Sequence, residues 1–149
     1  MGEFTESIYI DCKPDVAHRF ILDPTNTTLW QSNLVDYELL DDRVRKGALV
    51  RGVSKVAGRS VEWQMEYAEL DPGHRTVLRS VESPIAFTIE ETFEADGDGT
   101  TLTWHQESEP FGGFFGRLAD PLVVRLYRRD VRSNLDNLKL LLENCALAG

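Results

Sequence analysis

Four polar residues alternate with apolar and aromatic residues in strand-like segments: Tyr67, Ser80, Glu91 and Gln106. An unpaired carboxylate on an apolar face costs several kcal/mol unless it is hydrogen-bonded or protonated. Such a carboxyl group can act as a general acid or base, and a tyrosine hydroxyl can orient a carbonyl. Glu91 and Tyr67 are therefore the candidate catalytic residues. The alternative for Glu91 is a place in water at an open end of the sheet, or an ion pair with an arginine.

The sequence shows no other recognisable catalytic or metal-binding pattern. His18, His74 and His105 are predicted on a helix surface, in a turn and on an outer sheet face, which does not favour a triad or a metal site. Cys12 and Cys145 have no second cysteine or histidine at ligand spacing. We expect two reduced core thiols, with a disulfide or a reactive thiol as the alternative. We predict no metal and no cofactor.

The composition is that of a soluble globular protein. The chain has 149 residues, 42% hydrophobic and 28% charged, and we expect residues 1–149 to form one domain that folds without a metal or disulfide. Sixteen Lys and Arg against 25 Asp and Glu give a net charge of −9, which disfavours nucleic acid and anionic lipid as partners. No apolar run approaches the ~20 residues of a membrane span, and the start lacks a secretory leader. We therefore expect a cytoplasmic protein without stable membrane insertion.

The first 30 residues predict one strand and two short helices. Phe4–Cys12 places apolar residues on one face at every second position, as a half-buried strand does. Pro14 suits the first turn of a helix, and apolar residues at helical spacing continue it to Leu22. After Asp23 and Pro24, a second short helix ends near Trp30.

Residues 34–108 predict six further strands and no long helix. The strands are Leu34–Leu40, Ala48–Val56, Val61–Leu70, Thr76–Glu82, Ile85–Ala95 and Thr101–Ser108. Asp71–His74 and Asp96–Gly99 carry the residues of tight hairpin turns, so neighbouring strands are antiparallel. Together with the first strand they predict one strongly curved seven-stranded antiparallel sheet.

The turns predict which side chains share a face, because partners across an antiparallel pair add to a constant. A two-residue loop at Pro72 and Gly73 gives the pairs Met65 with Ser80, Glu66 with Arg79, and Tyr67 with Leu78. A loop at either Gly97-Asp98 or Asp98-Gly99 puts Ile89, Glu91 and Phe93 on the face of Leu102, Trp104 and Gln106. A one-residue bulge in Thr76–Glu82 would invert that strand.

Leu118–Ala146 predicts a long amphipathic helix that covers the apolar face of the sheet. Its apolar stripe is Val124, Tyr127, Val131, Leu135, Leu138, Leu142 and Cys145. The other face carries Arg125, Arg128, Arg129, Arg132, Asp136, Lys139 and Glu143, which we interpret as a solvated surface, with a docking site for an acidic partner as the alternative.

Wide aromatic side chains with a few polar groups are typical of the walls of a small-molecule pocket, although a plain core remains the alternative. The candidate ligand-binding residues are Trp30, Trp63, Met65, Tyr67, Ser80, Phe87, Ile89, Glu91, Trp104, Gln106, Phe111, Phe115, Val131 and Leu135. Phe111–Gly116 combines phenylalanines with glycines, so it predicts either a lid or a permanent plug at the end of the sheet.

Several phrases of the sequence resemble the polyketide cyclase/dehydrase-like branch of the START-related helix-grip superfamily. They are Val16–Pro24 followed by Trp30, Tyr67–Pro72, Gly99–Thr103 and Asn137–Glu143. The resemblance covers nearly the whole chain. It implies an α+β helix-grip fold, in which the sheet wraps around the C-terminal helix and encloses an apolar cavity.

The resemblance leads us to expect a binder or carrier of a hydrophobic molecule, such as a lipid, a polyketide or an aromatic compound. The first alternative is a polyketide aromatase/cyclase or dehydratase that acts in the same cavity, although our register places no arginine inside. The second is a protein-interaction module with a filled core. A homodimer is possible under each hypothesis.

Overall fold

The computed structural model describes residues 2–56, 58–81, 86–109 and 121–148. Within these ranges, seven strands form one antiparallel sheet in the order β1-β7-β6-β5-β4-β3-β2. The elements are β1 (Gly2–Ile10), α1 (Pro14–Leu22), η1 (Pro24–Asn26), α2 (Thr27–Trp30), β2 (Leu34–Leu39), β3 (Leu49–Val56), β4 (Arg59–Asp71), β5 (Arg75–Ser80), β6 (Ala86–Asp96), β7 (Gly99–Glu109) and α3 (Pro121–Ala148). The predicted fold class is confirmed.

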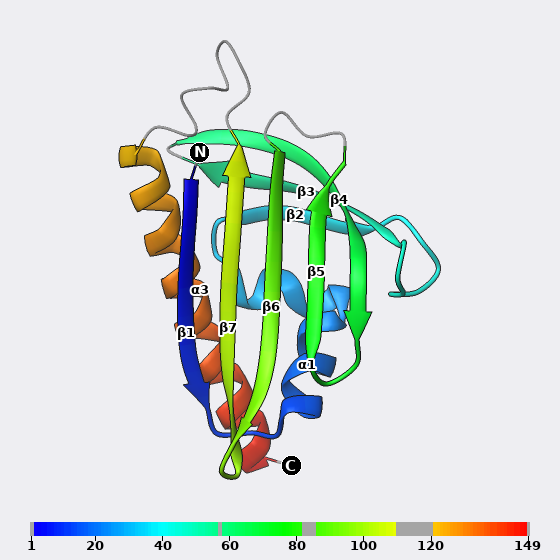
Figure 1. Cartoon of the computed structure of the whole chain (residues 1–149), viewed down its shortest axis with the longest axis vertical. Coiled ribbons are helices and arrows are strands. Elements are labelled where there is room, and N and C mark those ends of the chain that lie inside the picture. Colours follow the sequence, from blue (N-terminus) through cyan, green and yellow to red (C-terminus); the bar gives the residue numbers. More distant parts are fainter. Residues whose placement is uncertain (1, 57, 82–85, 110–120, 149) are drawn as a thin grey trace.

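The helices lie on one side of the curved sheet. Figure 1 shows β1, β7, β6 and β5 side by side, while β4, β3 and β2 bend across one end of the molecule. Helix α3 lies beside β1. Helix α1 contacts β6 and β7 and lies toward the end of the molecule where these two strands are joined by their hairpin turn. One hydrophobic core joins these elements. None of the helices in the described ranges is long and apolar enough to cross a membrane.

The turn between β4 and β5 has three residues, so the predicted two-residue loop is wrong. Asp71 pairs with Arg75, and Gly73 occupies the turn with a φ of 79°. The register then shifts between Tyr67 and Glu69, which leaves Ala68 as a bulge. This bulge cancels the extra turn residue, and the predicted pairs further along, such as Tyr67 with Leu78, are confirmed.

The hairpin of β6 and β7 has the first of the two predicted loops, and the predicted inner face is confirmed. Asp96 pairs with Gly99, so Gly97 and Asp98 form the loop, and Gly97 has a φ of 61°. Side chains alternate between the two faces, so this register places Glu91 beside Trp104 on the inner face.

His18 is buried, which corrects the prediction that it lies on a helix surface. Its Nδ1 accepts a hydrogen bond from the Gly73 backbone N–H at 2.7 Å, and its Nε2 lies 2.5 Å from Thr76 Oγ1. The ring also packs against Phe93 at a centroid distance of 4.6 Å. Both ring nitrogens are paired, so a polar side chain can occupy the inner face of α1. Burial lowers the pKa of His18, which favours the neutral ring.

The predicted apolar stripe of helix α3 packs into the core. The opposite face is not fully solvated, because some of its residues contact β1 and the residue that follows it. The buried apolar residues of the helix in the described part of the chain are Val131, Leu135, Leu138 and Leu142. The side chains of Val124 and Cys145 lie outside the described part of the chain. On the polar face, Arg128 Nε lies 2.6 Å from Glu6 Oε1, Lys139 Nζ donates to Tyr9 O at 2.7 Å, and Glu143 accepts from Asp11 N at 2.9 Å. These residues attach α3 to β1, whereas Arg125, Arg129 and Arg132 are exposed.

The contacts of His18 predict a large loss of stability in His18→Ala. The substitution leaves the Gly73 N–H and the Thr76 hydroxyl without their partner and opens a void, so we expect the free energy of unfolding to fall by about 2–4 kcal/mol. Urea unfolding followed by circular dichroism measures this loss. His74→Ala, at an exposed position of the same turn, is the control and should cost less than about 0.5 kcal/mol. Equal effects of the two substitutions would contradict the assigned role of His18.

Candidate ligand cavity

A cavity of about 120 Å³ lies between the inner face of the sheet and the helices. Its lining residues are Phe4, Ile21, Leu22, Thr27, Trp30, Gln31, Tyr37, Ser54, Val61, Trp63, Met65, Tyr67, Leu78, Phe87, Ile89, Glu91, Trp104, Gln106, Ser108 and Tyr127. They come from all seven strands and from α1, α2 and α3. The volume is roughly ten times what one water molecule needs, so the cavity can hold an organic molecule.

The aromatic walls are held by specific contacts. The Trp63 indole lies over Gly52 on the neighbouring strand, where a Cβ would overlap the ring, and its Nε1 donates to Ser54 Oγ at 2.9 Å. The Trp63 ring meets Tyr37 and Phe87 edge-on, each at a centroid distance of 6.2 Å. Edge-to-face packing keeps these flat rings at steep angles to one another, so they form walls around an open space.

A second pair of indoles closes another side of the cavity. Trp30 and Trp104 meet edge-on at a centroid distance of 6.2 Å. The Trp104 Nε1 donates to Gln106 Oε1 at 3.1 Å, and Gln106 Nε2 lies 3.4 Å from Ser108 Oγ. The Trp30 indole N–H is buried and has no hydrogen-bond partner in the described ranges. The Gln106 side chain is therefore held by Trp104, whereas the indole N–H of Trp30 is an unpaired hydrogen-bond donor among the described residues of the cavity wall.

Glu91 is the ionisable acid of the cavity wall. The residue is 2% exposed, and no described residue forms a hydrogen bond or an ion pair with its carboxyl group. Burial raises the pKa of Glu91 from 4.5 to about 7. The alternatives of an exposed Glu91 or a partner arginine are therefore wrong for the described part of the chain. The hypothesis that Glu91 faces the pocket stands.

Two tyrosine hydroxyls approach each other in the same cavity. Tyr37 Oη and Tyr67 Oη are 3.5 Å apart. Burial raises the pKa of both, and the charge of Glu91 raises them further. Burial also raises the pKa of Tyr127 to about 12. All three phenols are therefore neutral at physiological pH and can donate a hydrogen bond.

Nine predicted ligand-binding residues line the cavity: Trp30, Trp63, Met65, Tyr67, Phe87, Ile89, Glu91, Trp104 and Gln106. Ser80 does not line the cavity; its Oγ accepts a hydrogen bond from Phe87 N at 2.9 Å. Val131 and Leu135 pack in the core instead. Phe111 and Phe115, including their predicted lid or plug, lie outside the described residues.

Sequence reasoning missed several lining residues. Tyr127 belongs to the predicted apolar stripe of the helix, yet it lines the cavity, whereas Val131 packs in the core. Tyr37 follows a register shift in β2, which strand alternation alone does not reveal.

A buried amide on α3 supports the segment that follows Trp30, and sequence reasoning missed it too. Asn134 is 3% exposed, and its Oδ1 accepts from Ser32 N at 3.0 Å while its Nδ2 donates to Asn33 Oδ1 at 2.9 Å. A polar residue next to the apolar stripe of the helix was the available signal.

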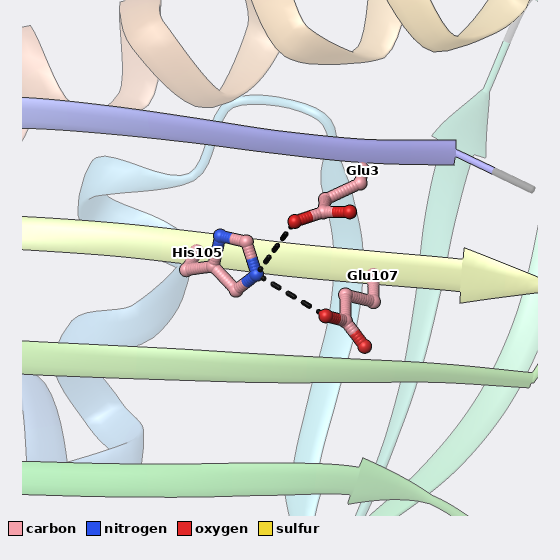
Figure 2. Close-up of side chains that lie close together, drawn as sticks. All are labelled: Glu3, His105 and Glu107. Atoms are coloured by element: carbon pink, nitrogen blue, oxygen red, sulfur yellow. Dashed lines mark hydrogen bonds and ion pairs between the residues drawn. The ribbon is translucent and has the colours of Figure 1, made fainter.

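The outer face of the sheet carries a separate cluster, Glu3, His105 and Glu107, whose ligand atoms lie within 4.8 Å of one another. Figure 2 shows His105 Nε2 between the two carboxylates, 3.5 Å from Glu3 Oε1 and 3.4 Å from Glu107 Oε1. Glu3 and Glu107 oppose each other across β1 and β7, and the His105 ring lies within reach of both carboxylates. Exposed acidic groups often cluster in this way without a metal, and we assign none.

The model of the family described as "Polyketide cyclase / dehydrase and lipid transport" matches residues 1–143. A search of curated protein sequences found no match. Similar folds occur among solved structures. A protein from Thermus thermophilus is 23% identical with a TM-score of 0.80, over 97% of this chain and 99% of that one.

Two further structures of similar fold carry functional or descriptive names. The Zhui aromatase/cyclase from Streptomyces sp. R1128 is 17% identical with a TM-score of 0.78, over 95% of this chain and 93% of that one. Major latex-like protein 151 from Panax ginseng is 16% identical with a TM-score of 0.74, over 93% and 95%. These similarities support the helix-grip fold predicted from the sequence. Because the family model matches 1–143 of the 149 residues, the chain belongs to the polyketide cyclase/dehydrase and lipid transport family.

Proposed function

We propose that the protein binds a hydrophobic small molecule in the cavity between the sheet and the helices. The observation that carries the proposal is the internal space of about 120 Å³ with aromatic walls on several sides. An empty space of this kind forfeits the dispersion contacts that a filled core would make. A bound apolar molecule would restore those contacts and would also remove its own surface from water.

The aromatic rings and the polar groups of the cavity would make different contacts with a ligand. Trp63 and Trp104 provide broad apolar surfaces, which favour a flat or aromatic ligand. Glu91 and the hydroxyls of Tyr37 and Tyr67 offer the polar contacts that would orient it. The alternative of an interaction module with a filled core required a packed interior, and the cavity counts against it.

A second candidate function is the cyclisation or dehydration of a polyketide-like chain. The observation that favours it is the carboxyl of Glu91, whose pKa of about 7 suits proton transfer near neutral pH. Glu91 would exchange a proton with the substrate, and Tyr67 would orient a carbonyl by hydrogen bonding. Genes for a polyketide synthase beside the gene for this protein, and product formation that Glu91→Gln abolishes, would favour the enzyme over a binder.

Blocking the cavity should abolish binding of an apolar probe. Ser108→Phe places a ring in the cavity from β7, so we expect the affinity for the neutral fluorophore N-phenyl-1-naphthylamine to fall at least tenfold. Titration of protein into the fluorophore measures the affinity. The matched control is Glu107→Phe, one residue earlier and on the outer face, which should bind as the wild type does. Circular dichroism checks that both variants fold. Equal affinities for the two variants, or no binding by the wild type, would contradict the proposal.

Glu91 should make stability decrease with rising pH. Its pKa is 4.5 when unfolded and about 7 when folded, so the folded state keeps a proton that the unfolded state releases. The free energy of unfolding therefore falls as the pH rises from 4.5 to 7, by about 3 kcal/mol for this group. Glu91→Gln removes that loss, so its stability relative to the wild type should rise by about 3 kcal/mol between about pH 4 and pH 8.

Denaturant unfolding across this pH range measures the difference between Glu91→Gln and the wild type. His18 titrates in both proteins, so its contribution cancels in the subtraction. Glu94→Gln, at an exposed position of the same strand, is the control and should leave the pH profile unchanged. A difference between Glu91→Gln and the wild type that does not vary with pH would show that Glu91 titrates normally.

A further inference from the structure

The cavity wall contains one acidic side chain, Glu91, with no basic side chain beside it among the described lining residues. Among its described lining residues, Glu91 is the acidic residue and none is lysine, arginine or histidine. A carboxylate that is 2% exposed cannot rely on bulk water to solvate its charge. Apart from water inside the cavity, only a proton or a cation that enters the cavity can compensate its charge.

The described residues of the neighbouring elements do not provide that cation. Thr76 lies opposite Glu91 across β5 and β6, and the Thr76 hydroxyl bonds the buried His18 of α1. His18 stays neutral in this arrangement, because its Nδ1 accepts a hydrogen bond from the Gly73 N–H and therefore carries no proton. Arg128 of α3 binds Glu6 at the edge of the sheet instead.

Aromatic rings surround the position that a ligand cation would take. Trp104 is the direct partner of Glu91 across β6 and β7, a relation that brings the two Cβ atoms to about 5 Å. Tyr37 and Tyr67 lie close enough for the charge of Glu91 to raise their pKa values. The electron-rich face of an indole or phenol attracts cations, and proteins bind ammonium ligands among aromatic rings.

We propose that the cavity selects hydrophobic molecules that carry one basic amine, whose ammonium group pairs with the Glu91 carboxylate among Trp104, Tyr37 and Tyr67. This inference rests on the proposed ligand-binding function and names the ligand class. It also excludes fatty acids and other apolar carboxylates, because they would place a second acid beside Glu91. The net charge of −9 acts in the same direction, since it attracts cations and repels anions at longer range.

Three probes with one apolar skeleton test the selection: 2-naphthylmethylamine, 2-naphthalenemethanol and 2-naphthoic acid. Isothermal titration at about pH 8 keeps the amine protonated, as a lysine side chain would be, and Glu91 mostly ionised. We expect the amine to bind at least tenfold more tightly than the alcohol, and the acid to bind most weakly. In Glu91→Gln the amine should lose at least tenfold in affinity while the alcohol changes less than about threefold. Glu94→Gln is the control for surface charge and should bind all three probes as the wild type does.

The outcomes separate this inference from the proposed function. If the alcohol binds as tightly as the amine, or if Glu91→Gln leaves the amine affinity intact, the cavity binds apolar molecules but the amine selection is wrong. Tightest binding of the acid would also overturn the selection. If none of the three probes binds and N-phenyl-1-naphthylamine does not bind either, the proposed function itself fails. Loss of amine affinity in both Glu91→Gln and Glu94→Gln would show a general charge effect and would overturn the role of Glu91.

Discussion

The pairing of β6 with β7 decides which side chains face the helices, and the remaining features of the cavity depend on it. Asp96 meets Gly99 across a two-residue loop, so Glu91, Trp104 and Gln106 point inward while His105 points outward. A slip of one residue would put His105 among the aromatic rings and expose Trp104 to water. The acid of the cavity and the outer cluster of His105 thus result from the same register.

The size of the inner side chains explains why this interior stays open. Leu102 of β7 and Leu138 and Leu142 of α3 are almost fully buried in the core. At the cavity, the wide, flat rings of Trp63 and Trp104 cannot interdigitate as leucines do. Helix-grip proteins that are 16–23% identical to this chain share its fold.

Local sequence patterns were sufficient for the architecture and for much of the cavity wall. Alternation along the strands and the two turns predicted that Trp63, Tyr67 and Glu91 face inward, since each depends on short-range geometry. The errors arose where tertiary structure decides. The bulge at Ala68 compensates a three-residue turn, which no local pattern specifies. Burial of His18 depends on partners more than 50 residues away, namely Gly73 and Thr76.

A crystal structure of the protein grown with N-phenyl-1-naphthylamine tests most directly whether the space between sheet and helices is a ligand site. The account predicts density for one probe molecule inside the sheet, in van der Waals contact with Trp63 and Trp104. Density confined to the outer surface, or side chains that close the space around Glu91, would contradict it.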